Sequence, residues 1–386
     1  MKKIFNIILY YFLITFNISV IADEKPGEKF LKIGVLAPLS GEFKDIGNSV
    51  LYSANLALHD IGEKNIKIFP KDSGSNKEKI LKACEEFQEE GIKIVIGPVD
   101  SKFIKELNKF DDLIFLSLSN MDSEIKNNVI MMGINLESQL LAIQNFINKN
   151  KRNKTIILYP NNEFSNYVER EIGKLSFKKK LFKYSEDPKV LTKQIEKLTN
   201  YNQRKINLES RIKKLEKNED SESLKELNLL NQKHTLGNVN FDSVIIIDFG
   251  NGLKSVLTSL AYTDALGEDI LIITANQWFN NDILSETSIN NFYFPSINLK
   301  NFIKFNSKFN QNYNYTPPEI AILAYDSIGL LYYFWKNDVK INATKDFNMK
   351  REIKAKIGKF KISQNKIIQK LEIYKLSENK FIKSSP

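Results

Sequence analysis

The chain has 386 residues, enough for two ordinary domains, and 42% apolar with 26% charged residues is typical of a folded globular protein. Its formal net charge is +10, but the lysines are spread along the whole chain among glutamates. No zinc-finger spacing and no aromatic RNA-binding motif accompanies them, so nucleic acid is not expected as a partner.

The N-terminus has the pattern of a secretory signal peptide. Met1–Lys3 is positively charged, Ile4–Ile21 is largely apolar, and the charged run Asp23–Lys25 follows the expected cleavage position. We expect residues 1–22 to be removed on export to the periplasm, with an uncleaved N-terminal anchor as the alternative. Because no cysteine lies near the junction, a lipoprotein anchor is not expected.

Short apolar strands alternate with amphipathic helices from residue 31 onward. In the first part of the chain, strands are expected at 31–39, 66–70, 92–97, 113–118 and 130–133, and helices at 48–62, 77–90 and 102–109. In the second, strands are expected at 155–159, 243–248, 270–274 and 292–294, and helices at 137–148, from about 165, and at 253–261, 302–312 and 319–336. Near-continuous apolar strands in such an alternation predict parallel sheets covered by helices on both faces.

The alternation therefore predicts an α/β fold of two doubly wound, parallel-sheet lobes with a ligand-type cleft between them. The first lobe is expected to comprise residues 31–136 plus about 300–340, because the last helices can return to it. The second is expected to comprise residues 137–299, and residues 341–386 form a C-terminal segment to which no element is assigned.

One stretch, Lys189–His234, shows no strand pattern. Its apolar residues fit two amphipathic helices separated by the turn-forming Asn218–Ser221. The first helix would carry Ile195, Leu198, Leu208, Ile212 and Leu215, and the second Leu224, Leu227 and Leu230. We predict an inserted helical hairpin within residues 189–236 of the second lobe, serving either as a solvated spacer or as a docking surface.

The loop after the first strand, "APLSGEFKDIGNSV", resembles a phosphate-binding loop only superficially. Gly41 and Gly47 are six residues apart, but Asn48 follows where a Walker A loop needs lysine, and no three-glycine dinucleotide fingerprint is present. It remains a loop at the carboxyl end of a strand, where open α/β sheets bind ligands. The Ser40 hydroxyl and the backbone amides of this loop are candidates for holding a small anionic group.

Polar residues follow several other strands and should converge on the same cleft. They lie in the segments Gly97–Ser101, Ser117–Asn120 and Tyr159–Asn162, at Asp248, and in Asn276–Trp278. Each is also a common turn former or helix cap, so their shared placement is the informative feature. The candidate ligand-binding residues are Ser40, Gly41, Gly97, Pro98, Ser101, Ser117, Ser119, Asn120, Tyr159 and Asp248.

The sequence offers little support for catalysis. Neither of its two histidines, His59 in a helix and His234 in the hairpin, is placed at a strand end. Cys84, the only cysteine, shares a helical face with apolar neighbours and is expected to be a packing residue. There is no Gly-x-Ser-x-Gly elbow, no His-Glu-x-x-His motif and no metal-ligand cluster. We expect no enzyme, no cofactor and no metal.

Several of these motifs resemble the type I periplasmic binding-protein fold, that of leucine-binding receptors, and most closely its penicillin-binding protein activator branch. The likeness covers roughly residues 31–340. It is carried by "IGVLAPLSGEFKDIGNSVLYSANLALHDIG", "KIFPKDSG", "GIKIVIGPVDS", "FLSLSN", "VIMMGINLESQLLAIQNF", "HTLGNVNFDSVIIIDFGNGLKSVLTSLAYTDA", "ITANQWFNND" and "AYDS".

The resemblance implies one of two non-catalytic functions. The activator branch implies a periplasmic regulator that contacts a peptidoglycan synthase, a penicillin-binding protein. The solute receptors imply binding of an amino acid or similar small anion, with an ABC permease as partner. In such receptors the loops after the first, third and fourth strands hold the ligand. By position, the resemblance implies that the ligand-binding residues of this chain are Ser40, Gly97–Ser101 and Ser117–Asn120 on the first lobe, and Tyr159 and Asp248 on the second.

Overall fold

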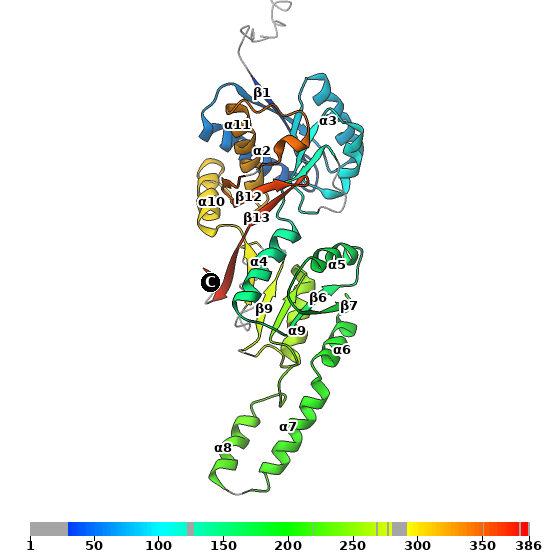
Figure 1. Ribbon diagram of the computed structural model, residues 1–386, viewed down its shortest axis with the longest axis vertical. Coiled ribbons are helices and arrows are strands. Elements are labelled where there is room, and N and C mark those ends of the chain that lie inside the picture. The colour runs from blue at the N-terminus through cyan, green and yellow to red at the C-terminus, as the bar shows by residue number, and fades with distance from the viewer. Residues whose placement is uncertain are drawn as a thin grey trace, which may run out of the picture.

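The computed structural model describes residues 30–121, 127–218, 220–267, 269–275, 278–279, 292–349, 351–377 and 380–384. Two α/β lobes follow one another along the long axis of the molecule, and a helical hairpin extends from the far end of the second lobe (Figure 1). The predicted signal peptide, residues 1–22, and the predicted cleft residues Asn276 and Gln277 lie outside the described residues. Within the described ranges, no helix is both long and apolar enough to cross a membrane.

The first lobe is built on an eight-stranded sheet with the order β11-β12-β13-β5-β4-β3-β1-β2. Its strands are β1 (Leu31–Ala37), β2 (Ile66–Asp72), β3 (Ile94–Ile96), β4 (Ile114–Ser117), β5 (Val129–Met131), β11 (Ile353–Ala355), β12 (Gly358–Ser363) and β13 (Lys366–Lys370). Strands β1 to β5 pair in parallel, as the apolar runs predict, whereas the pairs β11–β12 and β12–β13 are antiparallel.

The helical elements of this lobe are α2 (Lys44–Ile61), α3 (Lys77–Glu89), η1 (Ser101–Lys109), α10 (Leu299–Tyr313), α11 (Ala321–Lys336) and η3 (Thr344–Phe347). Helices α10 and α11 contact α2. The predicted helix at 102–109 is a 3-10 helix, η1, rather than an α-helix.

The second lobe is built on a seven-stranded sheet with the order β15-β14-β10-β9-β8-β6-β7. Its strands are β6 (Thr155–Pro160), β7 (Lys179–Tyr184), β8 (Ser243–Ile246), β9 (Leu271–Thr274), β10 (Phe292–Ser296), β14 (Glu372–Ser377) and β15 (Lys380–Lys383). Its helices are α4 (Leu136–Lys149), α5 (Ser165–Gly173), α6 (Pro188–Leu198) and α9 (Gly250–Tyr262). The fold class predicted from the alternation, two doubly wound α/β lobes, is confirmed.

The C-terminal segment supplies strands to both sheets, although the sequence pattern predicts none there. Strands β11 to β13 extend the first sheet, and after Leu371 the chain enters the second lobe, where β14 pairs antiparallel with β10. Strand β7 is also absent from the sequence prediction, because Lys179–Tyr184 forms the edge of its sheet and most of its side chains remain accessible. Such segments lack the apolar run of a strand that is buried on both faces.

The hairpin consists of α7 (Tyr201–Leu215) and α8 (Ser221–Leu230) and encloses a small core of Leu208, Leu215 and Leu230. The prediction of one continuous helix from Ile195 to Leu215 is wrong. The helix breaks at Asn200, which adopts a left-handed conformation with φ of 51°. As a result, α6 packs against α9 in the body of the second lobe, and only α7 and α8 project from it (Figure 1).

Candidate functional site

A pocket of about 310 Å³ lies between the two lobes. The first lobe contributes Asn120 and Met121 from the loop after β4, and the second contributes the loops after β6 and β8. The residues that line it are Asn120, Met121, Leu136, Pro160, Asn162, Phe164, Tyr167, Val168, Ile247, Asp248 and Phe249. Of the ten residues predicted to bind a ligand, this pocket brings together Asn120 and Asp248.

The loop after β1 is held by a carboxylate of its own chain. Asp72, at the end of β2, accepts hydrogen bonds from the Ser40 hydroxyl at 2.5 Å and from the Ser40 backbone amide at 3.1 Å. It also accepts from the amides of Leu39 and Gly74, and from Lys79 at 2.8 Å. The groups of Ser40 predicted to hold an anionic ligand therefore already bind an internal anion.

The electrostatics of this contact favour an ionised Asp72. Burial raises the pKa of Asp72, but the hydrogen bonds from Lys79, Ser40 and two backbone amides outweigh burial and hold that pKa well below its ordinary value. Neighbouring Gly41 is exposed, with φ of 80°. Asp72 opens the segment "DSG", which the sequence predicts only as a turn. In the structure, the side chain of Asp72 also holds the loop after β1 in place.

The loops after β3 and β4 also use their polar groups internally. The Ser117 hydroxyl donates to the Pro98 carbonyl at 3.2 Å and accepts from the Ser119 amide at 3.3 Å. The Ser119 hydroxyl accepts from the Met121 amide at 3.2 Å. Both serines are buried, so their hydroxyls shape the turn that presents Asn120 to the pocket.

Gly97 and Ser101 have structural positions in the same region. Gly97 has φ of 116°, and a Cβ atom there would lie 2.1 Å from the Leu36 carbonyl oxygen, so the close approach of the ends of the paired strands β3 and β1 requires glycine. Ser101 is the first residue of η1, after Asp100, whose side chain caps that helix. Neither residue lines the pocket.

On the second lobe, Tyr159 and Asp248 have different environments. Tyr159 is buried in the core beneath α5, and its hydroxyl donates to Glu169 at 3.1 Å rather than facing the pocket. Asp248 lines the pocket and accepts hydrogen bonds from the Tyr184 hydroxyl and from the Phe249 amide. Burial raises the pKa of Asp248, in opposition to both hydrogen bonds.

The described lining of the pocket carries one carboxylate, Asp248, and no lysine, arginine or histidine. Aromatic and aliphatic groups, including Phe164 and Val168, make up much of the remainder. Such a site can accept an ammonium group beside an apolar body. From the residues described, a ligand carboxylate would find backbone and amide donors at this pocket but no cationic side chain.

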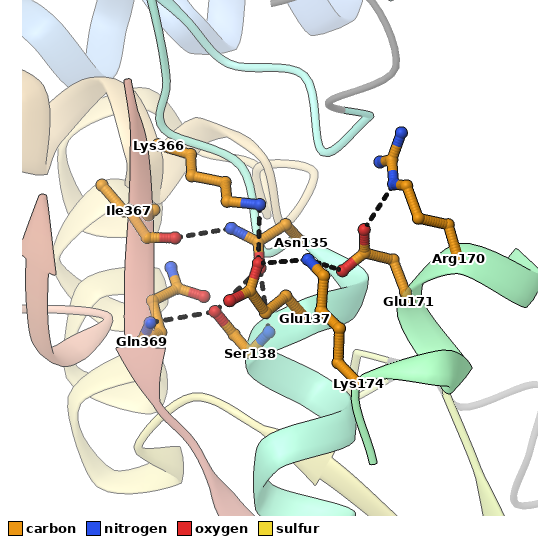
Figure 2. Close-up of polar contacts among 9 residues, drawn as sticks. All are labelled: Asn135, Glu137, Ser138, Arg170, Glu171, Lys174, Lys366, Ile367 and Gln369. Atoms are coloured by element: carbon orange, nitrogen blue, oxygen red, sulfur yellow. Dashed lines mark hydrogen bonds and ion pairs between the residues drawn. The ribbon is translucent and has the colours of Figure 1, made fainter. Parts of the chain in front are cut away.

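The segments that connect the lobes beneath this pocket are joined by buried hydrogen bonds (Figure 2). Asn135, the N-cap of α4, donates through its side chain to the Ile367 carbonyl at 2.5 Å and accepts from the Ser138 amide at 2.9 Å. The Ser138 hydroxyl in turn accepts from the Gln369 amide at 2.9 Å. Strand β13 of the first sheet is thereby fastened to the first turn of a second-lobe helix.

A chain of ion pairs continues from this junction across the second lobe (Figure 2). Lys366 contacts Glu137 at 2.6 Å, and Lys174 bridges Glu137 at 3.1 Å and Glu171 at 2.6 Å. The Glu171 side chain is fully buried and also accepts from Arg170 at 2.9 Å. This junction is not predictable from the sequence, since contacts between residues more than 200 positions apart give no local signal.

The side chains of His59 and Cys84, which could in principle take part in catalysis, do not line the interlobe pocket. His59 is exposed and lies 3.7 Å from Asp60 on α2. Cys84 is fully buried in the first lobe, and burial raises the pKa of its thiol to about 12, so it stays protonated. Among the described residues, no group of three or more histidine, cysteine, aspartate or glutamate side chains is arranged to hold a metal ion.

Comparison with known proteins agrees with this architecture. Residues 31–189 match the family model described as "Periplasmic binding protein". A search of curated protein sequences finds no match.

Solved structures of two functional kinds share the fold. Full-length LpoA from Haemophilus influenzae is 13% identical, with a TM-score of 0.61 over 93% of this chain, and this chain spans 59% of its length. The C-domain of that LpoA, described as a regulator of PBP1A, is 12% identical with a TM-score of 0.58, and 92% of this chain aligns with 100% of it.

A branched-chain amino acid ABC transporter periplasmic ligand-binding protein from Burkholderia xenovorans is 10% identical, with a TM-score of 0.64 over 92% of this chain and 94% of its own. LivJ from Streptococcus pneumoniae, solved with isoleucine, is 16% identical with a TM-score of 0.52 over 92% and 100% of the two chains. The chain therefore has the fold of the type I periplasmic binding proteins, shared with LpoA and with the leucine-binding receptors.

Proposed function

We propose that the protein is a non-catalytic periplasmic regulator of peptidoglycan synthesis that acts by contact with a peptidoglycan synthase, a penicillin-binding protein. The observation that carries this proposal is the internal use of the strand-end groups. The Ser40 hydroxyl is bonded to Asp72, the Ser117 hydroxyl to the Pro98 carbonyl in the loop after β3, and the Ser119 hydroxyl to the Met121 amide. A receptor for small anions needs such donors directed at its ligand.

The likeness to LpoA supports the same proposal at the level of the fold, because this chain aligns with that C-domain from end to end. The hairpin gives a surface for protein contact. Its exposed apolar side chains are Ile206, Leu224 and Leu229, with exposed fractions of 53%, 50% and 63%. Exposed apolar groups on a projecting element are typical of protein interaction sites.

The test is a pull-down of the chain with periplasmic domains of peptidoglycan synthases, followed by an assay of their synthesis rate. Leu229→Glu should weaken binding and stimulation, because it places a charge on the hairpin surface. Ile303→Glu on α10 is the matched control, since Ile303 is 54% exposed but lies away from the hairpin. Equal loss with both variants, or no binding by the unmodified protein, would contradict the proposal.

A second candidate is a solute receptor for amino acids, favoured by the placement of Asp248 in an interlobe pocket. Its carboxylate would pair with the ligand ammonium group. Thermal melting against millimolar amino acids separates the two functions, because a ligand at a thousand times its dissociation constant stabilises a protein by about 4 kcal/mol. A clear shift that is lost in Asp248→Asn would favour the receptor, and an unchanged melting temperature the regulator.

A further inference from the structure

A groove of about 440 Å³ lies at the end of the second lobe opposite the interlobe pocket. Strands β6, β7 and β8 run parallel, so their starts lie together at this end. The lining residues are Asn153, Lys154, Thr155, Ile156, Lys178, Lys179, Lys180, Lys197, Leu198, Asn200, Asn240 and Phe241. The groove borders the root of the hairpin, because Asn200 lines it and α7 starts at the next residue, Tyr201.

The charge of this groove is of one sign. Five lysines line it, and no aspartate or glutamate is among its lining residues. In the part of the chain that the structure describes, Lys154, Lys178, Lys180 and Lys197 have no carboxylate within ion-pair distance. By contrast, Lys71 and Lys174 each pair with two carboxylates and Lys366 pairs with Glu137. Like charges gathered in a concavity concentrate positive potential there.

Lys179, the fifth lysine of the groove, and the neighbouring Asp242 are already engaged in other contacts. Lys179 is half-buried, donates to the Leu175 carbonyl at 2.7 Å, and lies 5.8 Å from the ring centre of Phe177. Asp242, the residue after Phe241, accepts the backbone amides of Asn153 and Lys154 at 2.9 and 3.1 Å. The negative charge of Asp242 is therefore partly balanced by these two backbone amides, which belong to the loop before β6.

We propose that this groove, defined by Lys154, Lys178, Lys180 and Lys197, binds an acidic peptide segment of the partner that docks on the hairpin. The four lysines are exposed, and a single exposed ion pair contributes little. The ligand must therefore present several carboxylates along one segment. The amide side chains of Asn153, Asn200 and Asn240 can bond its backbone.

The edge of the sheet supports a peptide as the occupant. Strand β7 starts at the groove and is the last strand of its sheet, so one side of its backbone has no neighbouring strand. An extended segment can pair with such an edge while its carboxylates contact Lys178 and Lys180. Edge lysines also discourage edge-to-edge aggregation, and this purely protective role predicts no affinity for acidic peptides.

The test measures binding of a fluorescein-labelled hexaglutamate peptide to the full protein by fluorescence anisotropy, with hexaglutamine as the uncharged peptide. The variant is Lys178→Glu/Lys180→Glu. The matched control is Lys300→Glu/Lys304→Glu on α10, which makes the same change in net charge away from the groove. We expect hexaglutamate to bind and hexaglutamine not to bind, with binding weakened about tenfold by the groove variant and little by the control.

Raising NaCl from about 50 to about 300 mM should also weaken binding, because exposed charges are screened by salt. Equal weakening by both double variants would assign the effect to net charge and overturn the proposal. Affinity for inorganic pyrophosphate without affinity for hexaglutamate would assign the groove to a small anion and overturn it as well.

This inference rests on the proposed docking of a synthase, but the experiments can contradict either proposal without contradicting the other. Hexaglutamate binding that depends on Lys178 and Lys180, together with no synthase in the pull-down, would contradict the proposed function and leave the groove as a site for acidic segments. Synthase binding that depends on Leu229 but not on Lys178 and Lys180, with no hexaglutamate binding, would contradict the groove alone.

Discussion

Lys366 on β13 and Glu137 in the first turn of α4 form an ion pair of 2.6 Å that joins the first sheet to a helix of the second lobe (Figure 2). The Lys366 side chain is 8% exposed. Burial raises the pKa of Glu137, but Lys366 and Lys174 outweigh it and hold that pKa below its ordinary value. The pair therefore helps to hold the two lobes in their relative position, through two side chains that are far apart in the sequence.

Lys366→Met should destabilise the protein by about 2 kcal/mol, because it leaves a partly buried carboxylate with one cation fewer. Chemical denaturation gives the free energy of unfolding. Lys370→Met on the same strand is the control, since Lys370 is exposed, and it should change that free energy by less than about 0.5 kcal/mol. If both substitutions lowered the free energy of unfolding equally, the ion pair of Lys366 with Glu137 would have no special role in stability.

Asp72→Asn should destabilise the first lobe by about 2 kcal/mol at neutral pH, since it disturbs the hydrogen bonds from Ser40 and Lys79. The pKa of Asp72 is lowered in the folded state. Its stabilisation is therefore present above the unfolded pKa of about 4 and is lost as the pH falls below it. The variant should lose less stability than the unmodified protein between about pH 5 and pH 2.5.

Asp112→Asn, in an exposed turn, is the control for Asp72. It should keep both the neutral-pH stability and the acid profile of the unmodified protein. An acid profile of Asp72→Asn that matches the unmodified protein would show that Asp72 titrates as an ordinary surface carboxylate.

Arg204→Met should loosen the attachment of the hairpin to the second lobe. Arg204 is 6% exposed and donates to Gly237, Thr263, Thr235 and Asp264 at 2.7–3.0 Å. Its loss leaves buried carbonyl groups without donors, at a cost of about 3 kcal/mol. Hydrogen exchange should become faster along α7 and α8 before the remainder of the lobe is affected.

The matched control for Arg204 is Arg211→Met in the same helix. Arg211 forms a bidentate pair with Glu226 at 2.8 and 2.6 Å, but both side chains are largely exposed. Such an exposed pair contributes little to stability, because water and salt screen it. Faster exchange in both variants to the same degree would assign the effect to loss of any hairpin arginine.

Asp326→Asn should alter the response of stability to rising pH. Burial raises the pKa of Asp326 to about 7, in opposition to hydrogen bonds from the amides of Ile357 and Lys356. Since the folded pKa lies above the unfolded one, the favourable contribution is complete below about pH 4 and is lost as the pH rises through about 7. The unmodified protein should lose more stability than the variant between about pH 5 and pH 8, as measured by thermal unfolding at each pH. Parallel profiles would contradict this prediction.

The elements with the clearest local signals were predictable. Helix α3 and strand β1 have the predicted type and nearly the predicted bounds, since their apolar residues recur at the spacing that burial on one or both faces requires. By contrast, β7 and β11 to β15 are short, lysine-rich and partly exposed, so they show little of that pattern. Their strand geometry comes from pairing with neighbours that are remote in the sequence.

The candidate site was likewise predictable only in part. From residue types and strand ends alone, Asn120 and Asp248 could be expected near the interlobe pocket, because loops at the carboxyl ends of parallel strands meet there. The partner of each polar group was beyond local reasoning. Ser40 bonds Asp72, 32 residues away, and the hydroxyl of the buried Tyr159 bonds Glu169 on α5.

The amino-acid pattern thus establishes two parallel-sheet lobes and the helical insertion, because periodic burial is a local property of strands and helices. The assignment of the C-terminal strands to both sheets, the ion pair of Lys366 with Glu137 and the internal bonding of Ser40 arise only on folding. Each depends on contacts between segments that the chain brings together from far apart, and hydrogen bonds and ion pairs of that kind leave no periodic trace in the sequence.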